Sequence, residues 1–186
     1  MGYKELPVLN KIFRKPYILR YNKYSAPLIN LVSLAGLIAV MFGLFDVNWY
    51  IAAVMYFMYW CIGVSITFHR YISHFSFNFR WQWLETLCVL IGNAAGQGDG
   101  YSWSTIHKQH HLHTDKEHDP HGKNQGWIKH FLGQGYEEVP FQIHNKRLKS
   151  KLAVYSFKYY TAYFVAWWLA LYIVGGEMLL FSVGVV

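Results

Sequence analysis

The sequence PLINLVSLAGLIAVMFGLF, from Pro27 to Phe45, is followed after three residues by WYIAAVMYFMYWCIGVSITF, from Trp49 to Phe68. Both runs are nearly free of charge. At ~1.5 Å of rise per residue, each is long enough as a helix to cross a hydrocarbon core of ~30 Å. Only residues 46–48 separate them, and a bilayer offers no partner to unpaired backbone groups. The pattern therefore predicts two membrane spans joined as an antiparallel helical hairpin.

Two further apolar segments lie near the C-terminus. Leu152–Val174 is a third candidate span, rich in Tyr and Trp, and a Gly-Gly-Glu sequence at 175–177 interrupts it. Met178–Val186 has the composition of the start of a fourth span. We therefore predict an all-α fold, a polytopic membrane helical bundle that forms one domain over residues 1–186 and is incomplete at its C-terminal end.

The segment between the second and third spans, residues 69–151, differs in kind because it holds all ten histidines and most of the acidic residues. Within it, Trp83–Ala95 is apolar but too short to span a membrane. We expect this stretch to form a helix that lies at the membrane interface or packs against the bundle.

The net charge of +7 is distributed in a way that favours membrane topology over nucleic-acid binding. Basic residues precede the first and the third apolar runs: Lys4, Lys11, Arg14, Lys15, Arg20 and Lys23, then Lys146, Arg147, Lys149 and Lys151. Basic residues beside membrane spans stay in the cytoplasm. We therefore predict an integral, multi-pass membrane protein with a cytoplasmic N-terminus, a cytoplasmic histidine-rich segment and no nucleic-acid partner. A basic RNA-binding arm is the alternative reading of the N-terminus alone.

The first histidine cluster is His69-Arg-Tyr-Ile-Ser-His74, directly after the second span. Five residues of an ideal α-helix advance ~500°, so the two rings would diverge by roughly 140°. Both reach one metal centre only if the helix unwinds near its end, or else they bind different ions. This spacing alone is more typical of interfacial or structural histidines than of metal ligands.

The second cluster is His107-Lys-Gln-His110-His111, whose i, i+3, i+4 spacing puts three rings on one helical face. Neutral imidazole binds iron, zinc and copper well. Structural zinc sites have four ligands and usually include Cys, whereas Cys61 and Cys88 lie inside apolar stretches. Five histidines fit two redox metals better than one tetrahedral ion. Iron is favoured, and two zinc ions remain the alternative.

The segment after the second cluster contains candidates for an outer shell around the metal. Metal-bound imidazoles usually donate their other N–H to a carboxylate or carbonyl group. Asp115, Asp119 and His121 are the candidates for this role. Asp119, which precedes Pro120, has a turn-forming role as its alternative. The other histidines, 113, 118, 130 and 144, are expected in solvated loops or at the interface.

Four motifs resemble the membrane fatty acyl desaturases of the Δ9, acyl-CoA desaturase type. They occur in the same order over about residues 27–150: FHRYISHFSF (68–77), AGQGD (95–99), SWSTIHKQHHLHTDKEHDPH (102–121) and GWIKHFLG (126–133). The resemblance implies iron ligation by His69, His74, His107, His110 and His111, with no catalytic residue beyond the metal ligands. It also implies that Trp103 lines the acyl-chain channel.

The resemblance further implies four spans beneath a cytoplasmic cap that holds two iron ions. With dioxygen and two electrons, such enzymes introduce a cis double bond into a saturated acyl chain. The implied partners are membrane lipid, an acyl substrate carried by CoA, acyl carrier protein or a glycerolipid, and an electron donor such as cytochrome b5 or ferredoxin. The chemistry of this reaction agrees with a redox metal. An unactivated C–H bond has no acidic proton for a base to remove, so a redox cofactor is required.

Two departures from the family pattern leave alternatives open. The family's third histidine cluster, H-x-x-H-H, has no counterpart, and no histidine follows His144. Thr105 and Ile106 stand where animal enzymes carry charged residues that contact the CoA headgroup. The alternatives are a related di-iron hydroxylase, a non-catalytic metal-binding membrane protein and, against the predicted hairpin, a soluble zinc hydrolase.

Overall fold

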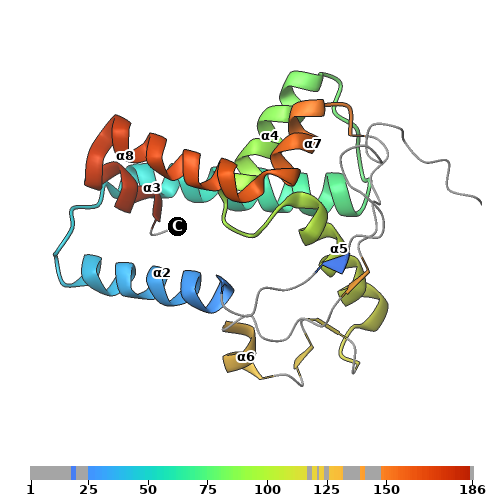
Figure 1. Ribbon diagram of the computed structural model, residues 1–186, viewed down its shortest axis with the longest axis horizontal. Helices are drawn as coiled ribbons and strands as arrows, with labels where there is room; N and C mark the ends of the chain where they lie inside the picture. The colour runs from blue at the N-terminus through green and yellow to red at the C-terminus, as the bar shows by residue number, and fades with distance from the viewer. Residues whose placement is uncertain are drawn as a thin grey trace, which may run out of the picture.

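The computed structural model describes residues 18–19, 25–116, 119–120, 122–123, 126–131, 139–140 and 148–184. The prediction of an all-α fold is confirmed, since helices make up almost all of the regular structure described (Figure 1). The elements are β1 (Ile18–Leu19), α2 (Ser25–Met41), α3 (Trp49–Tyr56), η1 (Phe57–Ser73), α4 (Gln82–Ala94), α5 (Gly100–His113), α6 (Trp127–Phe131), β2 (Val139–Pro140), α7 (Lys151–Lys158) and α8 (Tyr160–Gly184). The two short strands pair antiparallel, with Ile18 opposite Pro140 and Leu19 opposite Val139.

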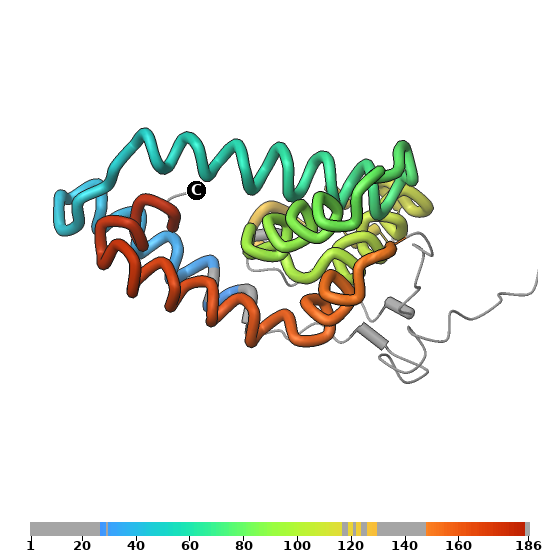
Figure 2. The backbone as a smooth tube through the Cα atoms, turned by 90° about the horizontal axis from the view of Figure 1, so that it is seen from above, coloured from blue at the N-terminus to red at the C-terminus, as the bar shows by residue number. Residues whose placement is uncertain are grey.

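The helix that carries the first histidine cluster is a long continuous rod (Figure 2). Asn48 caps its start, where the side-chain oxygen accepts hydrogen bonds from the N–H groups of Tyr50 and Ile51. At Phe57 the α-helix α3 becomes the π-helix η1, in which each N–H donates to the carbonyl five residues earlier. The Thr67 hydroxyl supports this wider winding by donating to the Ile62 carbonyl at 2.7 Å.

The loop between the two predicted spans is anchored by the end of α8. The Asn48 N–H donates to Ser182 Oγ at 2.7 Å, and the rings of Phe45 and Phe181 stack at 3.8 Å between centroids. Helix α2 ends at Met41, before the predicted boundary at Phe45. The interruption predicted at 175–177 is confirmed, because Gly176 adopts a non-helical φ of 60° and kinks helix α8 there.

Two described segments are long and apolar enough to cross a membrane, Trp49–Ser73 and Tyr160–Gly184. The second is very poorly covered by protein, with 6% of its most apolar window buried. Its exposed side chains include Leu169, Ile173 and Val174, the last two 80% exposed. Water would disfavour so large an apolar surface. The chain is therefore a membrane-associated protein.

The helices beyond the rod pack around its histidine-bearing end. Helices α4 and α5 pack against η1, and α7 packs against α4. The buried core here includes Phe68, Tyr71, Val89, Tyr101 and Phe157. The helix predicted over Trp83–Ala95 is confirmed as α4, and it packs against the bundle.

Candidate metal centre

The two histidines of the first cluster converge because the helix that carries them is wound as a π-helix. The His74 N–H donates to the His69 carbonyl at 3.0 Å, so residues five apart lie one turn apart. The two imidazole centroids are 4.6 Å apart. The divergence expected for an ideal α-helix therefore does not occur, because the π-helix is wound more loosely than an α-helix.

Helix α5 supplies the second cluster, and its start is fixed by Asp99. The Asp99 carboxylate accepts hydrogen bonds from the N–H groups of Tyr101 and Ser102 at 3.0 Å. One turn of α-helix then brings His107 and His111 to the same face, with their Nε2 atoms 3.0 Å apart.

The two clusters meet as a group of four imidazoles, His69, His74, His107 and His111. The Nε2 atoms of His74 and His107 are 3.1 Å apart. One ligand nitrogen from each of the four rings lies within 4.8 Å of every other. Imidazole nitrogens bind a metal at about 2.0–2.1 Å, so nitrogens that share one ion lie roughly 3–4 Å apart. The group is thus compact enough to hold a metal ion.

The surroundings disfavour protonation of His74 and His107. Burial, together with the neighbouring imidazoles, lowers the pKa of His107 to about 3. Burial also lowers the pKa of His74, with further contributions from His111 and Lys108. A neutral imidazole has a lone pair available for a metal, whereas a protonated one does not. His74 and His107 are therefore available to bind a cation at neutral pH.

His110 lies outside this group of four and is held by a carboxylate. Its Nδ1 is 2.8 Å from Asp119 Oδ1, and Asp119 is 1% exposed. Asp119 Oδ2 also accepts a hydrogen bond from the Asp115 backbone N–H at 2.7 Å. The Asp115 carboxylate itself lies 3.5 Å from Lys123 Nζ. His121, the third predicted outer-shell residue, lies outside the described residues, as do His118 and His144.

Comparison with known proteins shows which sequences the chain resembles. No family model matches the chain. The chain is 34% identical over 137 residues to the sn-1 stearoyl-lipid 9-desaturase of Anabaena variabilis, which covers 69% of this chain and 50% of that protein. It is 33% identical over 141 residues to the sn-2 palmitoyl-lipid 9-desaturase of Nostoc sp. (strain 36), with coverages of 69% and 49%. It is 28% identical over 133 residues to the acyl-CoA C20 Delta5-desaturase of Anemone leveillei, with coverages of 69% and 42%.

The chain belongs to the membrane fatty acyl desaturase family. The resemblance seen in the sequence motifs is thereby confirmed. The chain spans about half the length of the curated relatives named above.

Trp103 lies directly beside the imidazole group. Its ring stacks on that of His107, with centroids 4.7 Å apart and planes 24° apart. It also lies 6.2 Å from the rings of His69 and Phe68. The indole therefore forms part of the wall around the candidate metal centre.

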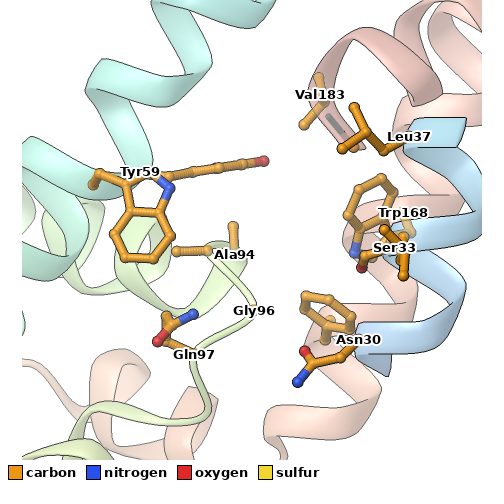
Figure 3. Close-up of a pocket in the computed structure, with 14 residues that line it drawn as sticks. Asn30, Ser33, Leu37, Tyr59, Ala94, Gly96, Gln97, Trp168 and Val183 are labelled. Carbon is orange, nitrogen blue, oxygen red and sulfur yellow. The ribbon is translucent and has the colours of Figure 1, made fainter. Parts of the chain in front are cut away.

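A pocket of about 420 Å³ lies between α2, η1, α8 and the loop that leads into α5. Figure 3 shows Tyr59, Ala94 and Gln97 on one side of it, facing Ser33 and Leu37 on the other. Its lining is mainly apolar and aromatic, with a few polar side chains. Gln97 is at the same time part of the loop before α5, so the pocket adjoins the helix that carries the second histidine cluster.

Glu85 is a buried acidic residue that contacts Tyr71, between the two histidines of the first cluster, and it was not among the residues predicted from the sequence. The signal that could have found it is a single acidic residue inside the apolar run from Trp83 to Ala95. A carboxyl group in such a run must find hydrogen-bond donors inside the protein. The structure supplies them from Tyr71, Lys149 and Ser150.

Proposed function

We propose that this chain supplies part of the iron centre of an oxygen-dependent acyl desaturase that introduces a cis double bond, at the Δ9 position, into a saturated acyl chain. The observation that carries the proposal is the convergence of His69, His74, His107 and His111 from two separate helices. Family membership and two relatives named as 9-desaturases support it.

The proposed metal is a pair of iron ions held by these four histidines and by His110. All four grouped residues offer imidazole nitrogens as ligands, and such ligands suit iron, zinc or copper. Removal of hydrogen from an unactivated carbon requires the redox chemistry that iron supplies when bound. His110 fits the ligand set because histidine ligands are commonly oriented by a carboxylate on their other ring nitrogen, as Asp119 is on its Nδ1.

We propose a glycerolipid as the acyl carrier. The Thr105 hydroxyl is turned inward, 1% exposed, and donates to the Tyr101 carbonyl at 2.9 Å. Thr105 and Ile106 are both uncharged, so neither can form an ion pair with the phosphates of CoA. The two cyanobacterial relatives are named for lipid-bound acyl groups, while the Anemone relative is named for acyl-CoA.

The protein's task in this reaction is to hold one methylene pair beside the metal and to keep water away. Trp103 provides a flat apolar surface next to His107, and we propose that the acyl chain passes it. The pocket beyond Gln97 is a suitable receptacle for the rest of the chain, because its walls are largely apolar. If the path of the acyl chain through the protein is fixed, the distance of each carbon along that chain determines which carbon lies beside the metal.

We propose a multi-pass arrangement in which the histidine clusters face the cytoplasm, where a soluble or membrane-bound electron donor such as ferredoxin or cytochrome b5 would deliver electrons. The basic residues before the spans support this orientation.

Metal analysis of the purified chain tests the iron centre. We expect the chain, loaded with Fe²⁺ without oxygen and freed of excess metal, to retain iron, and His107→Ala to lose most of it. His113→Ala is the matched control, because His113 lies on the same helix but outside the group of four. Equal iron in the chain and both variants, or none in any of them, would reject the site.

Product analysis tests the reaction. After expression in a host fed saturated fatty acids, gas chromatography should detect new Δ9-monounsaturated chains esterified in glycerolipids. Hydroxylated chains instead would favour the di-iron hydroxylase, and unsaturation confined to acyl-CoA would reject the glycerolipid proposal. Iron binding without new lipid product would identify a chain that binds metal but does not catalyse.

A further inference from the structure

Glu85 is a fully buried acidic residue where three helices meet. It belongs to α4 and is 0% exposed. Its carboxyl group accepts a hydrogen bond from the hydroxyl of Tyr71 on η1. The same group accepts hydrogen bonds of 2.9 Å from the backbone N–H groups of Lys149 and Ser150, which immediately precede α7. One side chain therefore joins the end of η1 to the beginning of α7.

The α7 side of this junction is firmly held. Ser150 caps α7, and its hydroxyl accepts a hydrogen bond from the Ala153 N–H at 3.2 Å. Thr86 of α4 donates to the same hydroxyl at 2.6 Å. In Figure 1, α4 and α7 lie side by side at this point. The carboxyl group of Glu85 is therefore fixed relative to both helices.

The other side of the junction is Tyr71, which lies between the two histidines of the first cluster. Its side chain is 1% exposed, and its ring packs edge-on against Phe79 with centroids 4.7 Å apart. With the ring packed and the hydroxyl bound to Glu85, the last turn of η1 has little freedom to rotate.

That last turn determines whether His69 and His74 converge. The π-helical winding is marked there by the His74 N–H donating to the His69 carbonyl, and by Ser73 Oγ donating to the Phe68 carbonyl at 2.8 Å. A change to α-helical winding would separate the two imidazoles by roughly 140° around the axis. The end of η1 therefore needs an external contact that selects one winding over the other.

We propose that Glu85 is a positioning residue for the first histidine pair: through Tyr71, it holds the end of η1 in the π-helical winding that brings His69 and His74 together. The inference rests on the metal site proposed above. It assigns a role in metal binding to a residue that touches neither the metal ligands nor the substrate.

Cobalt binding by the full chain in detergent tests this role, since Co²⁺ binds imidazole and its visible absorption reports ligand geometry. We expect Tyr71→Phe to raise the dissociation constant for Co²⁺ on the order of 10-fold, in the range seen when outer-shell partners are removed. The absorption bands should shift as well. Thr86→Val is the matched control, because it removes a neighbouring bond between α4 and α7 without touching η1, and it should leave both readings unchanged.

A second variant, Glu85→Gln, guards against a folding defect in the first. Glu85→Gln keeps one oxygen acceptor and so weakens the hydrogen bond to Tyr71, whereas Tyr71→Phe removes its donor. Once Tyr71→Phe has removed this bond, adding Glu85→Gln should therefore weaken Co²⁺ binding no further. Unchanged Co²⁺ affinity and spectrum in Tyr71→Phe and Glu85→Gln, even with lower thermal stability, would overturn the positioning role and leave the metal site standing. Absence of Co²⁺ binding by the unaltered chain would overturn the metal site and this inference together.

Discussion

At the scale of single residues, the histidine-bearing face of α5 depends on how that helix starts. Asp99 caps it by accepting hydrogen bonds from the N–H groups of Tyr101 and Ser102. Burial raises the pKa of Asp99 above its ordinary value of 3.8, although the hydrogen bonds from Ser102 and Tyr101 oppose this. Asp99 therefore stabilises α5 as a cap, while its negative charge destabilises the folded state because the carboxylate is buried.

We expect Asp99→Ala to lower the free energy of unfolding by ~1 kcal/mol through loss of the cap. Asp99→Asn keeps an oxygen acceptor but removes the charge. Because the folded pKa is raised, the stability that Asp99 contributes is full below pH 3.8 and falls as pH rises above that value. The thermal midpoint of Asp99→Asn, relative to the unaltered chain, should therefore be higher at neutral pH than in acid. A difference that is the same at both pH values would contradict this account.

At the scale of helices, η1 and α4 approach so closely that only glycine fits at their contact. A Cβ atom on Gly63 would lie 2.7 Å from Gly92 Cα and 2.9 Å from Gly92 N. These are backbone atoms, so no side chain can turn away to make room. The contact brings α4, and with it Glu85, against the histidine-bearing rod.

We expect Gly63→Ala to destabilise the fold by about 1–3 kcal/mol, the usual cost of overpacking. Gly36→Ala is the control, because Gly36 is also helical but a Cβ atom there would meet nothing within 4 Å. This control should unfold at the same temperature as the unaltered chain or a slightly higher one, given the greater helix propensity of Ala. Thermal unfolding in detergent measures both, and equal midpoints for the two variants would refute the close contact.

The helices also show where prediction from sequence succeeds and where it fails. The convergence of His107 and His111 follows from their i, i+4 spacing, because α5 is an ordinary α-helix. The convergence of His69 and His74 did not follow, since residue spacing carries no sign of π-helical winding. That winding depends on contacts with distant residues such as Glu85. For the same reason His110, on the predicted face of α5, turns to Asp119 instead of joining the group of four.

At the scale of the whole molecule, the two apolar segments limit how the candidate metal centre can be oriented relative to the membrane. The rod Trp49–Ser73 starts beside the short loop at 46–48 and ends at the histidines. If this rod crosses the bilayer, the loop and the histidine group must lie on opposite sides. The sequence predicted this arrangement from apolar length and the placement of basic residues.

Cysteine labelling in a background with Cys61 and Cys88 replaced by Ser tests that arrangement. We expect Asp46→Cys to react with a membrane-impermeant maleimide on intact cells. Lys116→Cys should react only after the cells are opened, because it lies just beyond the second histidine cluster. Both positions are exposed in the structure, so access is decided by the membrane. Labelling of both positions from the same side would contradict a membrane-crossing rod.

Because α3 continues into η1 without a break, the candidate metal centre is joined directly to the end of the apolar segment. A straight rod of 25 residues is roughly 35 Å long, so a change in tilt of ~10° at its far end would swing the histidine end by about 6 Å. Helices change their tilt when the bilayer becomes thinner or thicker. If the rod crosses the bilayer, the position of its histidine end relative to the membrane surface would therefore change with the thickness of the surrounding lipid, whose acyl chains are the proposed substrate.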